Sequence, residues 1–355
     1  MAPKARSPQR MRTSLRLPEG ISYGLCSSAS PQSSLTYVYL VALSEASAIK
    51  IFSDLRSRQF FGTCMSRTTS NPAEKQKGSM PEIVARSLMR SQTVAISDTY
   101  CQGTCRDLSV EEFTRTTQLV FPYRGVFVRH LAREQAIAEA NQVLFFNATE
   151  GYRVSHPVPG GDGSLSVIVS EPLLFELAPR ALLRSTPTPA FHQQRLRIDA
   201  RTQTLVALLR HSLREGIAEP LEAESLALTL VRRALGPRTT HAPGASAGRQ
   251  RIVDRAKLVL ANDLARHWTL AEIAAEVRVS PVYLTQLFQQ VEGMPLYRYQ
   301  LRLRLARALD LLGQYEDLTT LSLDLGFSSH SHFSAAFRRV YGCSPSDFRQ
   351  SALHR

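Results

Sequence analysis

The chain has 355 residues, enough for two or three domains, and 43% of them are hydrophobic, as packed cores require. Five cysteines, an odd number without a C-x-x-C pair, argue against a disulfide framework and give no indication of a zinc site. The formal net charge of +13 favours an anionic partner, but its distribution along the chain weakens that inference.

Residues 1–80 carry the largest share of the charge, with 11 basic and 4 acidic side chains. Residues 81–248 carry 18 basic and 16 acidic side chains, and residues 249–355 carry 14 basic and 10 acidic side chains. The first 80 residues are rich in serine and arginine without a sustained hydrophobic period, which predicts a disordered tail or an extension that precedes the true translation start. Their apolar stretch LTYVYLVALSEASA lies too far in for a signal peptide and is too short to span a membrane.

Residues 81–189 are expected to form an all-β domain. Short apolar runs such as TTQLVFPYRGVFVRHL, NQVLFFNAT and SLSVIVS are separated by glycine, proline and asparagine between about Ser91 and Leu177. This pattern suits a small antiparallel barrel or sandwich.

Polar side chains in this segment are candidates for effector binding. They are Tyr123, Arg124, Arg129, His130, Tyr152, Arg153 and His156. For any single one, a place on a strand or loop surface is the commoner outcome, because pockets use few polar groups. The segment lacks an H-x-H pair, so we expect neither the metal cluster of an enzymatic barrel nor a cofactor.

Residues 190–236 are expected to form a helical connector. Leucines recur at helical spacing from Arg195 to Leu235, first in the run Leu205, Leu208, Leu209 and Leu213 and then in the run Leu226, Leu230 and Leu235. Such helices can pack on the β domain, form a dimer seam, or both. Residues 237–249 are a flexible linker by composition.

The stretch WTLAEIAAEVRVSPVYLTQLFQQVEGMP predicts two short helices. Apolar residues recur at i, i+3, i+4 and i+7 from Leu270 and again from Leu284. Thr269 with Glu272 forms a capping box, Ser280 caps the second helix, and Gly293 ends it.

A second helix pair follows 49 positions later in LGFSSHSHFSAAFRRVYG. Its second helix is capped by Ser329, is ended by Gly342, and places Phe333, Ala336, Phe337 and Val340 on one face. His330 and His332 are two residues apart and therefore lie on different faces, which argues against a helical metal site.

One continuous helix, Leu296 to Gly313, is expected to join the two pairs. Leu301, Leu305, Ala308 and Leu312 would face inward, and Arg298, Arg302, Arg304 and Arg307 largely outward. At ~1.5 Å per residue the helix spans ~27 Å, so it can hold two reading helices about one DNA turn (~34 Å) apart.

Residues 250–355 resemble the DNA-binding domain of the AraC/XylS family of bacterial transcription regulators. The resemblance rests on LAEIAAEVRVSPVYLTQLF, LRLRLARALDLL and LGFSSHSHFSAAFRRVYGCSPSDFR. It implies a multidomain fold, in which an N-terminal all-β, cupin-like sensor barrel with a helical connector precedes an all-α domain of two helix-turn-helix units joined by a long helix. Ser322, Leu323 and Ala335 depart from the family's usual residues.

The expected activity is sequence-specific binding of double-stranded promoter DNA in response to an effector, with two recognition helices in successive major grooves. The base-reading candidates are Val282, Thr285, Gln286, His330, Ser331 and His332. The phosphate-binding candidates are Ser280, Arg298, Ser329, Arg338 and Arg339.

The partners that follow are promoter DNA, a small-molecule effector, a second copy of the chain, and RNA polymerase if the output is activation, which the resemblance favours modestly. We expect a cytoplasmic protein that is not an enzyme. The alternatives are a cupin-type enzyme with an accessory DNA-binding domain, a repair protein that accepts methyl groups on cysteine, and a structural DNA-binding protein. The missing metal cluster argues against the enzyme, and the lack of a Pro-Cys-His context argues against the repair protein. The long β-rich middle argues against a structural DNA-binding protein.

Overall fold

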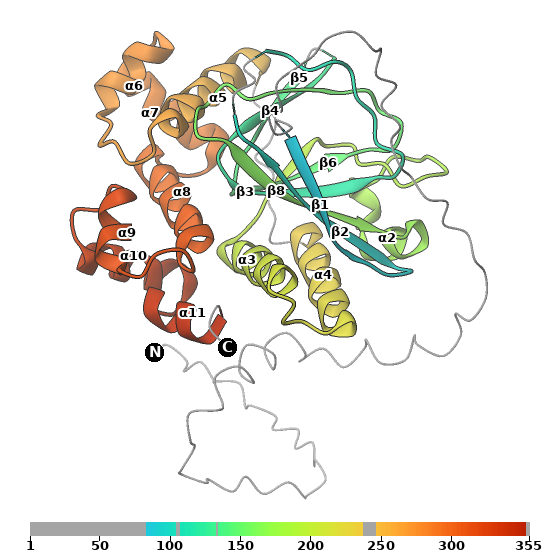
Figure 1. Cartoon of the computed structure of the whole chain (residues 1–355). Coiled ribbons are helices and arrows are strands. Elements are labelled where there is room, and N and C mark those ends of the chain that lie inside the picture. The colour runs from blue at the N-terminus through green and yellow to red at the C-terminus, as the bar shows by residue number, and fades with distance from the viewer. Residues whose placement is uncertain (1–82, 104–106, 133, 237–245, 353–355) are drawn as a thin grey trace, which may run out of the picture. The chain divides into compact units, whose positions relative to one another are not determined.

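The computed structural model describes residues 83–103, 107–132, 134–236 and 246–352, all within one compact unit, Lys50–Arg355. The predicted tail, residues 1–80, lies outside the described residues. So do residues 237–245, which make up most of the predicted linker. Figure 1 labels the elements, from strands in blue and green to helices in orange and red.

The N-terminal described region is an antiparallel β domain. Its strands are β1 (Ile83–Arg90), β2 (Val94–Cys101), β3 (Gln118–Arg124), β4 (Phe127–Leu131), β5 (Glu134–Ala138), β6 (Gln142–Phe146), β7 (Arg153–Ser155), β8 (Asp162–Val169) and β9 (Arg195–Arg197). One sheet has the order β1-β2-β8-β3-β6-β9 and the other β5-β4-β7. Over the described residues neither sheet closes on itself, so the closed barrel we expected is not seen there.

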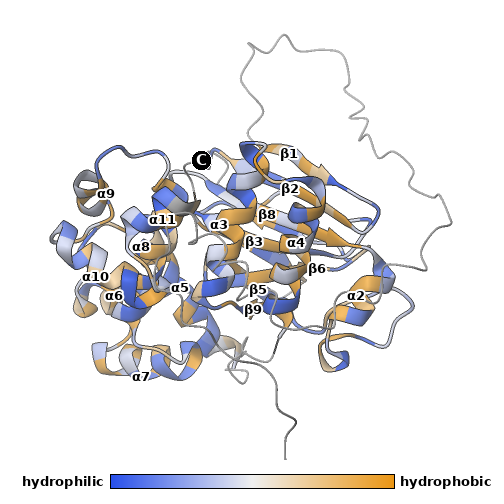
Figure 2. Cartoon of the chain, turned by 90° about the horizontal axis from the view of Figure 1, so that it is seen from below, coloured by the Kyte–Doolittle hydropathy of each residue, from blue (hydrophilic) through white to orange (hydrophobic). Residues whose placement is uncertain are grey.

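Alternation and continuous apolar runs explain why these segments are strands. On β2, Val94 and Ile96 are buried with a less buried residue between them. Strand β3 is buried along most of its length, and Figure 2 shows β3 and β8 as strongly hydrophobic. A fully buried strand needs cover on both faces.

Helices supply part of that cover. They are α2 (Glu171–Leu177), α3 (Ala200–Arg214) and α4 (Pro220–Leu235), with a 3₁₀ turn, η3 (Arg180–Leu182), after α2. Val206 and Leu209 of α3 and Leu230 of α4 share a core with the large sheet. The expected helical segment from Arg195 begins later than predicted, because Arg195–Arg197 pairs with β6 as strand β9.

The C-terminal described region is helical. It contains α5 (Ala247–Asn262), α6 (Leu270–Val277), α7 (Pro281–Glu292), α8 (Leu296–Leu311), α9 (Leu318–Asp324), α10 (His330–Tyr341) and α11 (Pro345–Ala352). These helices build two separate cores, one around Phe288 and one around Phe337. Residues of α8 enter both cores, with Leu303 in the first and Leu305 in the second.

The arginines of α8 correct the sequence-based expectation. Arg298 is exposed, but Arg304 is buried (8% exposed) and Arg302 and Arg307 are half-buried. The simple stripe predicts one buried face, whereas α8 packs between two cores and is covered on several sides. The outward positions of the middle turns are therefore partly enclosed.

Among the described residues, no helix is long and apolar enough to cross a bilayer.

Candidate nucleic-acid interface

Helix α7 is held in place by its ends and its inner face. The Ser280 hydroxyl oxygen accepts a hydrogen bond from the Tyr283 backbone N–H at 3.2 Å, and Pro281 occupies the first helical position. Gly293 ends the helix in the left-handed conformation, with φ of 63°. Leu284 and Phe288 are fully buried. The opposite face is consequently free of core packing.

The three base-reading candidates of α7 lie on that exposed face. Val282 is 69% exposed, an unusual position for a large apolar side chain, and Thr285 and Gln286 are exposed as well. The Thr285 hydroxyl donates to the Pro281 carbonyl at 3.0 Å, so its proton is engaged within the helix. Gln286 combines a donor and an acceptor, which matches the edge of adenine in the major groove.

Helix α10 repeats this construction. The Ser329 hydroxyl oxygen accepts from the His332 N–H at 3.1 Å, and Gly342 ends the helix with φ of 86°. Phe333 and Phe337 are fully buried and occupy the positions of Leu284 and Phe288, 49 residues earlier. The two helices therefore share register, caps and inner face.

The polar candidates at the start of α10 already make local contacts. His332 lies edge-on to Phe327, with ring centroids 5.5 Å apart, and its Nδ1 lies 3.2 Å from the Ser328 hydroxyl. His330 is half-buried, and its Nε2 lies 3.3 Å from the Ser334 hydroxyl. Ser331 is exposed. These contacts fix the orientation of both imidazoles.

The phosphate-binding candidates flank the two helices. Arg298 is exposed in the first turn of α8, and Arg338 and Arg339 are exposed in the last turn of α10. Ser280 and Ser329 are N-caps, so their oxygens serve the helix while their hydroxyl protons can be donated elsewhere.

Arg304 connects the two helix pairs, α6 with α7 and α9 with α10, through hydrogen bonds. Its guanidinium donates to the carbonyls of Leu264 at 2.8 Å, Ala265 at 3.1 Å and Arg266 at 2.9 Å, in the loop before α6. It also donates to the Gly326 carbonyl at 2.7 Å, in the turn between α9 and α10. One buried side chain thus bonds to backbone from both pairs.

Gly326 permits this close approach. Its φ is +78°, and a Cβ built there would lie 2.1 Å from the Ala265 carbonyl oxygen. Any side chain at this position would both strain the backbone and push the two segments apart.

The C-terminal end of α7 contacts the β domain through charged side chains. The Arg197 guanidinium, on β9, donates to the carbonyls of Val291 and Glu292 and forms an ion pair with the Glu292 carboxylate at 3.0 Å. Lys257 of α5 pairs with Glu292 at 2.7 Å and lies 4.0 Å from Glu139, which follows β5. Lys257, Glu292 and Glu139 are all at most 5% exposed.

The two buried carboxyls have opposite pKa shifts. Burial raises the pKa of Glu139 more than Lys257 lowers it. Burial also acts to raise the pKa of Glu292, but the positive charges of Lys257 and Arg197 outweigh it and hold that pKa below its ordinary value. Glu292 is therefore the carboxylate that carries the charge in this group.

Helix α10 has an equivalent contact. Tyr341, 49 positions after Glu292, donates its hydroxyl to Oε1 of Gln203 on α3 at 3.1 Å. Both candidate reading helices are thus bonded near their C-terminal ends to the region that precedes the linker.

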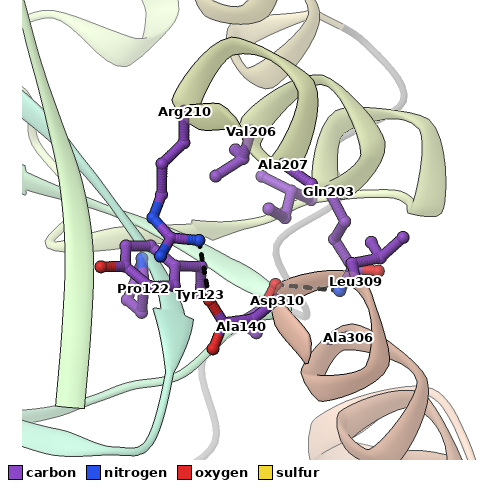
Figure 3. Close-up of a pocket in the computed structure, with 11 residues that line it drawn as sticks. Pro122, Tyr123, Ala140, Gln203, Val206, Ala207, Arg210, Ala306, Leu309 and Asp310 are labelled. Atoms are coloured by element: carbon purple, nitrogen blue, oxygen red, sulfur yellow. Dashed lines mark hydrogen bonds and ion pairs between the residues drawn. The ribbon is translucent and has the colours of Figure 1, made fainter. Parts of the chain in front are cut away.

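Tyr123 lies in a third contact between the β domain and the helices, shown in Figure 3. Its hydroxyl donates to Asp98 at 2.6 Å, and the Arg210 guanidinium lies 3.7 Å from its ring centroid. Arg210 also donates to Asp310 of α8 at 2.7 Å. Tyr123, Arg210 and Asp310 border a small cavity with room for about one or two water molecules. Its other lining residues are Pro122, Ala140, Ile198, Gln203, Val206, Ala207, Ala306 and Leu309.

The other effector candidates lie elsewhere. Arg129 is fully buried, donates to the Phe145 carbonyl at 2.6 Å and pairs with Glu150 at 3.3 Å. Its guanidinium lies 5.7 Å from the ring centroid of Tyr152, whose pKa is raised to about 12, mainly by burial.

Three of the remaining candidates have separate partners. The His130 imidazole lies 2.8 Å from the Ser155 hydroxyl, and burial lowers its pKa. His156 lies 2.5 Å from Asp162, and the Arg124 guanidinium lies 4.9 Å from the Tyr100 ring centroid. Arg153, on β7, is exposed. The seven effector candidates therefore do not converge on one cavity in the described structure.

Sequence reasoning missed the residues that link the β domain to the helices. Arg197, Arg210 and Asp310 carry no local motif, and they lie in segments interpreted by their apolar spacing alone. Only the three-dimensional fold brings residues about 100 positions apart, such as Arg210 and Asp310, into contact.

Comparison with known proteins identifies the C-terminal region. Residues 273–351 match a protein family described as a helix-turn-helix domain. The chain is 28% identical over 208 residues to a protein of Photobacterium leiognathi described as "Probable transcriptional regulator LumQ", a match that covers 56% of this chain and 78% of LumQ. It is 34% identical over 135 residues to the transcriptional activator RhaR of Klebsiella pneumoniae, covering 38% of this chain and 46% of RhaR.

A solved structure is similar as well. A transcriptional regulator of Chromobacterium violaceum with an AraC-type DNA-binding domain is 34% identical over 30% of this chain and 97% of that chain, with a TM-score of 0.28. LumQ and RhaR are both described as transcription regulators, and neither is described as an enzyme.

Proposed function

We propose that this chain, whose C-terminal residues form an AraC-type DNA-binding domain, is a transcription regulator that reads two successive major grooves of promoter DNA with α7 and α10. The observation that carries the proposal is the repeated construction of these helices. Each begins at a serine cap, ends at a left-handed glycine and has exposed side chains in its first turn, and the two copies lie 49 residues apart. Helix α8 and the Arg304 hydrogen bonds hold the two helix-turn-helix units in one arrangement.

The chemistry of recognition follows from the exposed side chains. In the first unit Gln286 hydrogen-bonds to adenine and Val282 packs on a thymine methyl group. In the second unit His330, Ser331 and His332 offer hydrogen bonds to base edges or phosphates. Arg298, Arg338 and Arg339 neutralise phosphates, so affinity falls as the salt concentration rises.

The β domain is proposed to be a cupin-like sensor for a small-molecule effector. It spans residues 81–189 and is followed by the helical connector, residues 190–236, and the DNA-binding domain, residues 250–355. The bonds from Arg197 to the end of α7 and from Arg210 to α8 support a sensor role, because a change in the β domain would reach the reading helices through them. A ligand in the cavity at Tyr123 would have to separate Arg210 from Asp310.

A regulator of promoter DNA acts where the chromosome is, so we place this protein in the cytoplasm. RNA polymerase is a further partner if the output is activation, and the leucine-rich connector can supply a dimer seam.

The test is selection of bound fragments from sheared genomic DNA of the source organism by the purified full chain. Wild type is expected to enrich a common asymmetric site with two half-elements about one helical turn apart (~34 Å). Gln286→Ala should relax the base preference in one half-element, and His332→Ala in the other. Gln350→Ala, an exposed residue of α11, is the matched control and should leave the selected site unchanged.

Two results would count against the proposal. One is binding that is insensitive to both salt and sequence. The other is a selected site that neither α7 nor α10 substitutions alter, which would place recognition elsewhere on the protein.

A further inference from the structure

Three buried side chains of different chemistry meet at one end of the large sheet. Cys101 is the last residue of β2, Asp162 is the first residue of β8, and the two are direct cross-strand partners. His156 lies in the loop before β8. The cysteine sulfur, an imidazole nitrogen and a carboxylate oxygen all lie within 4.8 Å of one another, and the three residues are 2%, 6% and 6% exposed.

We propose that Cys101, His156 and Asp162 form a binding site for a divalent transition metal ion, with Zn²⁺ as the preferred ion. This site is separate from the DNA-reading helices and from the cavity at Tyr123, and it goes beyond the proposed regulator function.

The donor set matches zinc chemistry. Zinc is bound in proteins by thiolate, imidazole and carboxylate, and sites with three protein ligands keep a fourth position for water or an exogenous ligand. A thiolate, a neutral imidazole and a carboxylate carry two negative charges together, which a divalent cation balances. That balance matters at a buried site, because an uncompensated charge there is costly. Magnesium and calcium are disfavoured, since they prefer all-oxygen sites.

Tight backbone packing positions the donors. A Cβ at Gly103 would lie 2.6 Å from the Gly161 nitrogen, and one at Gly161 would lie 2.5 Å from the Cys101 carbonyl oxygen. Both glycines have positive φ, so the segments that carry Cys101 and Asp162 approach more closely than side chains would permit. The Gly103 N–H also donates to the Cys101 sulfur at 3.3 Å, a contact that favours the thiolate.

Only a small movement is required to accept the ion. Bonds of ~2.0–2.3 Å in a tetrahedral arrangement place the ligand atoms ~3.3–3.8 Å apart. In this structure Nδ1 of His156 lies 2.5 Å from Oδ2 of Asp162, as a hydrogen bond. Metal binding replaces the proton shared by these two atoms, which then separate by about 1 Å, while the sulfur gives up its own proton to become a ligand.

Spacing along the chain does not reveal this site, because residues 81–189 contain neither the C-x-x-C nor the H-x-H pattern that marks local metal motifs. Cys101 and Asp162 are 61 positions apart and meet through the pairing of β2 with β8.

The experiment uses the full chain, purified under a non-thiol reductant and stripped with a chelator. Co²⁺ is titrated first, because a tetrahedral cobalt–thiolate site gives a near-ultraviolet charge-transfer band and strong visible bands, and Zn²⁺ is then added to displace it. We expect one ion per chain, with the thiolate band present. Cys101→Ser should abolish that band, and His156→Gln and Asp162→Asn should each weaken binding at least tenfold.

Cys343→Ser is the matched control, since this half-buried cysteine lies in the DNA-binding domain, and it should leave the titration unchanged. A thiolate band that survives Cys101→Ser would overturn the proposal, because it would report another cysteine. Failure of wild type to bind Co²⁺ or Zn²⁺ at micromolar concentrations would overturn it as well.

A measurement on wild type alone guards against variants that fail to fold. X-ray absorption of the zinc-loaded chain should show one sulfur at ~2.3 Å and nitrogen or oxygen ligands at ~2.0–2.2 Å. No sulfur, or several, would refute this ligand set. Neither experiment depends on DNA binding. The metal-site proposal can therefore fail or succeed independently of the proposed regulator function.

Discussion

Replacing Arg304 by methionine tests whether one side chain holds the two helix pairs together. The guanidinium donates four hydrogen bonds to backbone carbonyls at 2.7 to 3.1 Å. Hydrogen bonds from a charged donor contribute ~1.5–3 kcal/mol each, and the desolvation of a buried charge offsets several kcal/mol of that sum. We therefore expect a net loss of ~3–5 kcal/mol of unfolding free energy, as for breaking a buried ionic contact.

Thermal unfolding followed by circular dichroism measures this loss. For a domain of 150–250 residues 1 kcal/mol corresponds to ~2–4 °C, so the midpoint should fall by roughly 6–20 °C. Arg302→Met, at a half-buried position of the same helix, is the matched control and should change stability by no more than about 0.5 kcal/mol. If both variants unfolded at the same temperature as wild type, the proposed linkage through Arg304 would be wrong.

The remaining predictions concern single interactions. Gly326→Ala should destabilise the chain by ~1–3 kcal/mol in denaturant titrations, because its Cβ would lie 2.1 Å from the Ala265 oxygen at a positive φ. Glu292→Gln should lower the free energy of unfolding by ~3–5 kcal/mol near pH 7, where the lowered pKa of Glu292 keeps its carboxylate charged. In wild type this contribution should be lost as the pH falls through the folded-state pKa of Glu292. Glu139→Gln should cost far less, because the raised pKa of this carboxyl disfavours its charged form; an equal loss for both would contradict the assignment. Carbon-detected NMR titration of Glu272 should give a pKa of about 2, because its carboxylate accepts hydrogen bonds within the capping box. The stability that the charged Glu272 contributes should be present above about pH 4.5 and be lost as the pH falls toward 2.

Local features of the DNA-binding region could be predicted from the sequence because their causes are local. The capping box of Thr269 and Glu272, the serine caps and the glycine ends depend on residues within one turn of each other, and the structure confirms all of them. The buried stripes of α7 and α10 follow from the same short-range periodicity. The 49-residue repeat could be predicted by comparing these two patterns along the sequence.

Features set by distant segments could not be predicted in this way. Arg304 looked like an exposed position on one amphipathic helix, but the loop before α6 and the turn before α10 cover it. The expected helix from Arg195 began as a strand, because β6 offered an edge for pairing. In each case the decisive partner is tens of residues away, and a single sequence does not reveal it.

The contacts of β9 with α7 and of α3 with α10 offer a route by which the proposed signal would reach both helices. Arg197 bonds to the last carbonyls of α7, where helix carbonyls lack partners within the helix and a positive charge is favoured. Gln203 bonds to Tyr341 at the equivalent position of α10. Because β9 and α3 are consecutive in the chain, a displacement of this one segment would act on both helices at their C-terminal ends, away from the first turns that we propose contact DNA. Such a displacement would tilt both helices together, so an effector need alter only one region of the β domain to change the fit to both grooves.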